Sequence, residues 1–267
     1  MTAARLLLAA APGHGQLDYA LARLHHRLAR IPGEGAWAQL APLVDYHHYL
    51  DAAARQPLAD WLGGLSREAD VHGLEQALRQ RHVEELRRVA GWLPPAYAPL
   101  LRWCEYLPYL DFAGFLQRRE PAPEWMQADP RLAAWLEGRE AGVLAELLGG
   151  QGAAAGQGRR GAGGRHRVNR HWLAGFWRRL PEALAVLRAD ARFRNLLEAV
   201  VEGHPLHEAG LAPESRTLPR LLREAHHQVM QAPLAALYPL LVHWLLLRLR
   251  AELVPRRLDL KLAGEVA

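Results

Sequence analysis

Apolar residues at three- and four-residue steps limit the possible folds of this chain more strongly than any other pattern. Between Leu17 and Ile31, five large aliphatic residues follow steps of 4, 3, 4 and 3. A similar stripe runs through residues 71–89, with one gap at His82. A helix places residues spaced in this way on a single face. Because no sustained alternation of apolar and polar residues indicates strands, the sequence predicts an all-α, multi-helix bundle.

The stretch 70–116 is expected to organise this bundle, as two helices joined by a proline-rich corner. Pro94, Pro95 and Pro99 are incompatible with a helix interior, so the chain is predicted to turn there. The side of the first helix opposite its apolar stripe is predicted to face solvent. That side carries Glu75, Arg79, Glu84, Glu85, Arg87 and Arg88.

A glycine- and arginine-rich stretch divides the helical patterns. Residues 149–164 contain eight glycines and no acidic residue, which is typical of a flexible loop. We therefore expect four regions within one continuous fold. They are a frayed N-terminus over 1–15, N-terminal helical bundles over 16–148, the flexible loop over 149–168 and a C-terminal helical bundle over 169–267.

Composition sets limits on the class of protein. The 267 residues are half hydrophobic, which is enough for one large domain or two small ones. The net charge of 33 − 28 = +5 is spread along the chain and is weak evidence for nucleic-acid binding.

A single cysteine, Cys104, excludes an intrachain disulfide and favours a reducing compartment. The uncharged stretch 233–247 is shorter than the roughly 18–20 residues of a membrane span and is predicted to be a core helix.

Several motifs could carry chemistry, but their contexts favour structural roles. The G-x-G-x-x-G pattern at residues 156–161 has no strand before it, which a dinucleotide site requires. His204, His207 and Glu208 lack an identifiable further metal ligand, so solvated histidines are favoured. Cys104 lies in an apolar segment and is expected to be a small buried residue. We expect no catalytic residue, no metal and no cofactor, and therefore no enzyme.

An arginine-rich tract at residues 159–170 gives an alternative function. It precedes Trp172, Phe176 and Trp177, and charge combined with stacking can bind single-stranded nucleic acid. The favoured interpretation is a solvated loop that leads into a helix whose aromatic residues lie in the core.

Four segments, taken in order, carry a further pattern. The first has a tyrosine, then an arginine four residues on, in a leucine-rich helix. The second has an acidic residue before L-E-x-x-L, the third an aspartate in an apolar segment, and the fourth is a charged, leucine-rich end. They are residues 19–28, 70–78, 107–116 and 252–262, and the residues that carry the pattern are Tyr19, Arg23, Leu74, Glu75, Asp111 and Glu252.

This ordered pattern resembles the central-stalk subunit of V-type and A-type rotary ATPases, a family with archaeal-type and eukaryotic-type members. Gly114 and Pro255 stand where that family usually has asparagine, so the resemblance is to a divergent member. It implies three related helical bundles that form a funnel. One rim would sit on the membrane rotor ring, and the cup would receive the lower end of the rotating shaft. The function would be mechanical, coupling the shaft to the ring during ion transport.

The resemblance also implies partners and a location. The partners would be the rotor-shaft and membrane-ring subunits, which would hold the protein in the cytoplasm at the inner face of the membrane. The predicted partner-binding residues are Arg79, Glu84, Arg87 and Arg88. The alternatives are a free-standing helical adaptor or scaffold, and a basic nucleic-acid-binding regulator that uses the arginine-rich loop.

Overall fold

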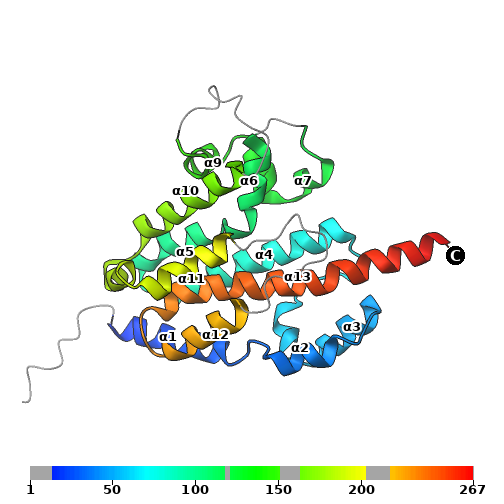
Figure 1. Cartoon of the computed structure of the whole chain (residues 1–267), viewed down its shortest axis with the longest axis horizontal. Coiled ribbons are helices and arrows are strands. Elements are labelled where there is room, and N and C mark those ends of the chain that lie inside the picture. The colour runs from blue at the N-terminus through cyan, green and yellow to red at the C-terminus, as the bar shows by residue number, and fades with distance from the viewer. Residues whose placement is uncertain (1–13, 118–120, 151–162, 203–216, 267) are drawn as a thin grey trace, which may run out of the picture.

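The computed structural model describes residues 14–117, 121–150, 163–202 and 217–266. Within these ranges every regular element is helical, which confirms the predicted all-α, multi-helix fold (Figure 1). Short 3-10 helices connect several of the α-helices. The α-helices are α1 His14–Leu28, α2 Glu34–Leu40, α3 Tyr46–Ala53, α4 Val71–Ala90, α5 Ala98–Cys104, α6 Leu110–Gln117, α7 Glu124–Ala128, α8 Pro130–Leu136, α9 Ala141–Leu148, α10 Gly163–Arg179, α11 Ala191–Glu202, α12 Thr217–His227 and α13 Leu234–Val266. The 3-10 helices are η1 Pro57–Trp61, η2 Pro95–Tyr97, η3 Leu107–Tyr109 and η4 Glu182–Arg188.

The longest helix, α13, crosses the middle of the molecule, and its C-terminal end projects beyond the other helices (Figure 1). Helices α4 and α12 pack along it, and α1, α3 and α5 also contact it. Every residue from Leu234 to Leu246 is buried, so this N-terminal part of α13 is surrounded by protein. By length and composition residues 234–259 could cross a membrane, but 78% of their most apolar 18-residue window is buried inside the protein. Such burial is typical of a core helix.

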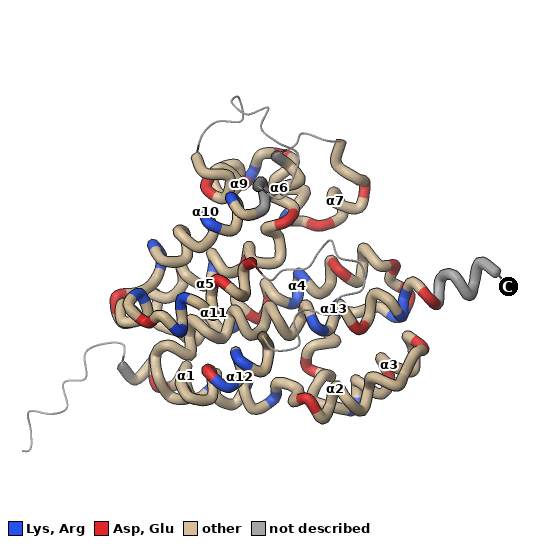
Figure 2. Tube along the Cα trace, in the orientation of Figure 1, with Lys and Arg blue, Asp and Glu red and all other residues tan. Residues whose placement is uncertain are grey.

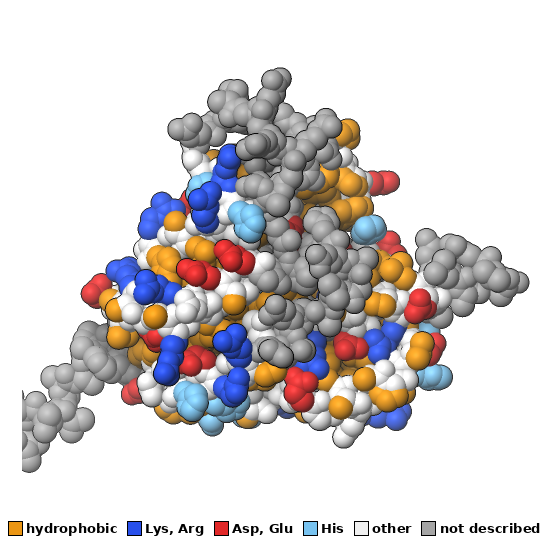
Figure 3. Space-filling model, in the orientation of Figure 1, with side chains coloured by type: hydrophobic (Ala, Val, Ile, Leu, Met, Phe, Trp, Pro, Cys, Tyr) orange, Lys and Arg blue, Asp and Glu red, His pale blue; other side chains and the backbone are white. Residues whose placement is uncertain are grey.

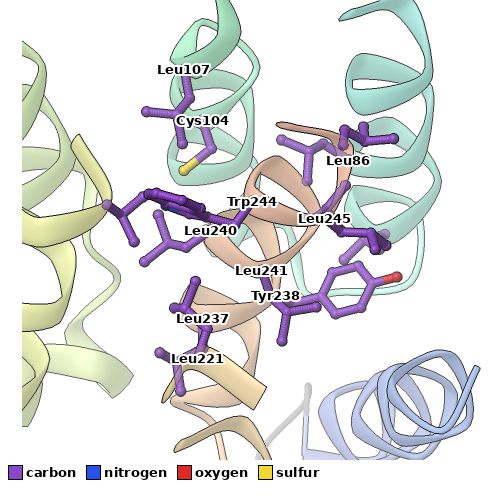
Figure 4. Close-up of a cluster of buried hydrophobic side chains, with 14 of the residues drawn as sticks. Leu86, Cys104, Leu107, Leu221, Leu237, Tyr238, Leu240, Leu241, Trp244 and Leu245 are labelled. Carbon is purple, nitrogen blue, oxygen red and sulfur yellow. The ribbon is translucent and has the colours of Figure 1, made fainter. Parts of the chain in front are cut away.

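The core joins the two ends of the chain. Figure 4 shows buried side chains of three helices lying against α13: Leu86 of α4 near Leu245, Cys104 of α5 near Trp244 and Leu221 of α12 near Leu237. Buried side chains from α1 through α13 belong to one hydrophobic cluster. Full burial of each large aliphatic side chain contributes about 1.5–3 kcal/mol. The regions before and after residue 150 are therefore stabilised by the same core.

Prolines divide some of the predicted helices. Helices α2 and α3 do not form one continuous helix, because Pro42 lies between them. The second arm of the hairpin over 70–116 is α5, η3 and α6, with Pro108 at the break. Helices α8 and α9 are separated without a proline, at Gly138, whose φ is 76°. The funnel of three related bundles stays a prediction.

The predicted flexible loop is shorter than expected at its C-terminal end. Helix α10 begins at Gly163, so residues 163–168 are helical instead of belonging to the loop. Glycines have low helix propensity, which led the sequence pattern to place the helix start too late. Residues 151–162 lie outside the described residues.

Candidate docking surface

Helix α4 carries all four predicted partner-binding residues, and a side-chain cap fixes where it begins. The Asp70 carboxylate accepts a hydrogen bond from the Gly73 N–H at 2.7 Å. This bond satisfies one of the backbone donors that a helix N-terminus leaves unpaired. The helix then runs for 20 residues between α13 and solvent.

Arg79 is not available to a partner, which corrects the prediction for this residue. Its Nε donates to Asp129 Oδ2 at 2.9 Å, and the two side chains are 8% and 0% exposed. The guanidinium also lies 5.8 Å from the centre of the Tyr109 ring and 5.0 Å from that of Phe112. A charged residue in a helical pattern is normally assigned to solvent, but Asp129, fifty residues away, supplies a buried countercharge.

Glu85 was also expected to face solvent, and it is fully buried. Its Oε1 accepts from Arg27 Nε at 2.9 Å and from the Tyr238 hydroxyl at 2.6 Å. Its Oε2 accepts from Arg88 Nη1 at 2.5 Å. Burial, together with the neighbouring Glu85 charge, raises the pKa of Tyr238 well above its ordinary value, so the hydroxyl keeps the proton that it donates. Glu85 therefore joins α1, α4 and α13 through three hydrogen bonds.

The other three predicted residues lie at the surface. The side chains of Glu84, Arg87 and Arg88 are 63%, 66% and 41% exposed. Glu84 lies 3.6 Å from Arg81, and Arg87 donates to Glu105 at 3.5 Å. Each pair joins an exposed group to a mostly buried one across a long contact, which contributes little to stability. The structure thus leaves Glu84 and Arg87 available for docking, whereas Arg88 is exposed but held by the buried Glu85.

The gap in the apolar stripe of α4 is filled by a buried polar contact. His82 is 1% exposed, and its Nε2 lies 3.0 Å from the carbonyl oxygen of Cys104, to which it can donate. Burial lowers the pKa of His82 to about 4, so the ring is neutral at pH 7. His82 and His243 of α13 meet edge to face with ring centres 5.7 Å apart. They line a cavity of about 50 Å³, which holds no more than a few water molecules.

Cys104 is buried, which confirms its predicted structural role. Burial, with a smaller contribution from the neighbouring Glu105 charge, raises the pKa of the thiol far above its ordinary value. A thiol held in this protonated form is a poor nucleophile.

The remaining candidate motifs lie partly or wholly outside the described residues. The G-x-G-x-x-G pattern at 156–161 and the set His204, His207 and Glu208 are not described. Among the residues that are, no group of three His, Cys, Asp or Glu side chains is placed to hold a metal ion.

The arginine-rich tract is described from Gly163 onward. Arg167 and Arg170 are exposed on α10, whereas Trp172 and Phe176 are fully buried. These two rings therefore cannot stack on bases, which supports the core interpretation for them, whereas Trp177 is only partly buried. On the face in Figure 3, basic, acidic and apolar side chains are interspersed, without a continuous basic field.

A set of arginines on α13 was missed by sequence reasoning. Each one reaches a different segment of the N-terminal region, and Figure 2 shows basic residues on the C-terminal part of α13. Their spacing on one helix was a signal, but their partners lie about 175 to 215 residues away. The contacts are Arg248 with Glu34 at 2.5 Å, Arg250 with Glu75 at 2.7 Å, Arg256 with the Leu43 carbonyl at 2.7 Å and Arg257 with the Glu68 carbonyl at 3.0 Å.

Comparisons of the chain with known protein families, with curated proteins and with solved structures found no match.

Proposed function

We propose that this protein is a non-catalytic, force-transmitting helical subunit, and specifically the central-stalk subunit that couples the rotor shaft of a V/A-type rotary ATPase to its membrane ring. The ordered resemblance of residues 19–28, 70–78, 107–116 and 252–262 motivates the specific assignment. In that role the protein would lie at the cytoplasmic face of the membrane, held there by its partners. No cofactor or metal is needed for it.

The cross-bracing of α13 is the observation that supports this proposal most. A part that transmits torque must resist sliding between its helices. Arg248 and Glu34 form two parallel hydrogen bonds, at 2.5 and 2.9 Å, between α13 and α2. The hydrogen bond from Arg248 lowers the pKa of Glu34 below its ordinary value, so the pair stays charged at pH 7. Arg250 braces α13 against α4, with its Nε and Nη2 both donating to Glu75 Oε1.

Bracing by several pairs matters more than the strength of each. A single exposed ion pair contributes about 0–1 kcal/mol. Contacts spread along one helix, however, oppose both translation and rotation of that helix against its neighbours. The exposed Glu84 and Arg87 on α4 would then supply polar contacts to a partner without weakening the core.

Co-purification tests the proposal. The tagged, full-length protein should recover rotor-shaft and membrane-ring subunits from its native cells. Arg87→Glu should reduce that recovery, because it reverses an exposed charge on the proposed surface. Arg192→Glu, at an exposed arginine on α11, is the matched control and should leave recovery unchanged. Recovery of neither kind of subunit by the unmodified protein would contradict the assignment and favour a free-standing adaptor.

A further inference from the structure

A cavity of about 480 Å³ lies between α1 and the C-terminal end of α4. Its volume is within the roughly 300–1,000 Å³ range of small-molecule sites. Tyr19, Arg23, His26 and Arg27 line it from one side of α1, at the three- and four-residue spacing of a helix face. The other wall consists of Arg88, in the last turn of α4, and Trp92, just beyond it. Among the described residues, no carboxylate lines the cavity.

Positive charge exceeds negative charge around this cavity. Arg27 and Arg88 share the buried Glu85, and Arg27 also pairs with Asp60 at 3.2 Å. Asp60 is itself shared with Arg30, 3.1 Å away. Counting Arg23 as well, four arginines face two carboxylates, 4 − 2 = +2. Glu85 is fully buried and is not among the lining residues, whereas Arg23, Arg27 and Arg88 are.

The guanidinium groups are held in place before any ligand arrives. Glu85 binds Arg27 through Oε1 and Arg88 through Oε2, which fixes the two side chains next to each other. Arg23 lies 5.2 Å from the centre of the Tyr19 ring and 4.8 Å from that of Trp92. Ordering these long side chains in advance lowers the entropic cost of binding.

Hydrogen-bond donors remain available on these arginines. Within the described residues, no carboxylate pairs with Arg23, and the buried Nη2 of Arg27 has no hydrogen-bond partner. A buried donor without a partner is unfavourable, so a shift of the Arg27 guanidinium toward a ligand acceptor would stabilise it.

The chemistry of the lining selects the class of ligand. A guanidinium matches the oxygens of a phosphoryl group with two parallel donors. A single carboxylate can be satisfied by one arginine, whereas three arginines around one cavity suit a group with several negative charges. We propose that this cavity binds a phosphate-bearing small molecule through Arg23, Arg27 and Arg88. The proposal does not depend on the proposed mechanical function.

Titration calorimetry of the full-length protein with inorganic pyrophosphate at low salt tests this site. We expect saturable binding with one ligand per chain. Arg23→Gln and Arg88→Gln should each weaken binding about tenfold, because each removes charge-assisted hydrogen bonds. Arg192→Gln, which removes an exposed arginine on α11, should bind like the unmodified protein. Arg23 is exposed and makes no ion pair among the described residues, so its replacement should leave the unfolding midpoint unchanged.

Further ligands identify the source of the phosphate. Tighter binding of ATP than of pyrophosphate supports the proposal and assigns a nucleotide. Binding to phosphoinositide vesicles that pyrophosphate displaces also supports it and assigns a lipid headgroup. Three results would each overturn the proposal. They are binding that does not saturate, a loss of pyrophosphate affinity in Arg192→Gln equal to that in Arg23→Gln, and preferential binding of a polyglutamate peptide over pyrophosphate.

Discussion

At the scale of single residues, two adjacent glutamates on α4 occupy opposite environments. The Glu84 side chain is 63% exposed, whereas that of Glu85 is fully buried. Successive residues on a helix point about 100° apart, so one position separates solvent from core. Glu85 is stable as a charged group only because Arg27, Arg88 and Tyr238 surround it. Removing one partner from a buried ion pair leaves the other without its countercharge.

Glu85→Gln should lower the free energy of unfolding by about 3 kcal/mol, because it leaves Arg27 without a full countercharge in a site of low solvent access. Glu84→Gln makes the same chemical change one residue earlier and should alter stability by no more than about 0.5 kcal/mol. Urea unfolding at pH 7 measures both values. Equal effects of the two substitutions would show that Glu85 is not held as described.

At the scale of helices, α5 and α10 approach closely through a glycine. The Trp103 indole donates to the Trp172 carbonyl at 2.8 Å, and the Trp172 indole donates back to the Trp103 carbonyl at 3.3 Å. Arg179 covers the Trp103 ring at 4.0 Å. A Cβ atom on Gly175 would lie 2.4 Å from Trp103 Cζ2, closer than atoms in contact can approach. Gly175 is therefore required for the contact between the two helices.

Gly175→Ala should destabilise the protein by about 1–3 kcal/mol, because it forces Trp103 out of this packing. Gly114→Ala is the control, since Gly114 lies within α6 and its added Cβ would contact nothing within 4 Å. That substitution should stabilise the protein by about 0.5–1 kcal/mol through reduced backbone entropy of the unfolded chain. Thermal unfolding of both variants measures whether each substitution raises or lowers the stability. A Gly175→Ala variant more stable than the unmodified protein would contradict the close approach of α5 and α10.

At the scale of the whole molecule, the C-terminal helix completes the core of the N-terminal half. Tyr238 on α13 reaches Glu85 on α4 across 153 residues of sequence. The N-terminal part of α13 is enclosed by helices from both sides of residue 150. Neither half can bury its apolar surface without the other, so the two halves should unfold together.

Urea unfolding followed by circular dichroism and by tryptophan fluorescence should therefore give a single, coincident transition. Tyr238→Phe should move both curves equally, by about 1–2 kcal/mol, because it leaves one Glu85 oxygen with fewer donors. The exposed Tyr19, replaced by Phe, is the matched control and should leave both curves in place. Two separate transitions, or a shift seen by one probe only, would mean that the halves are independent.

Local sequence pattern was sufficient to predict the helical class, because periods of three and four residues specify one apolar face wherever they occur. It also placed α1, α4 and the core position of Cys104, and it placed the turns after α4, where proline removes a backbone donor. The pattern could not locate a helix end that is rich in glycine. It assigned residues 163–168 to a loop, whereas α10 begins at Gly163.

Which charged residues of α4 are accessible depends instead on the packing of the folded chain. In the sequence, Arg79 and Glu85 are charged residues outside the apolar stripe, as Arg87 and Glu84 are. In the folded chain, however, Arg79 is buried against Asp129. Glu85 is buried against Arg27 and Tyr238. The cavity between α1 and α4 also arises from residues about seventy positions apart. Local sequence specifies which way a side chain points on its helix, whereas burial and pairing depend on what the rest of the chain brings to that side.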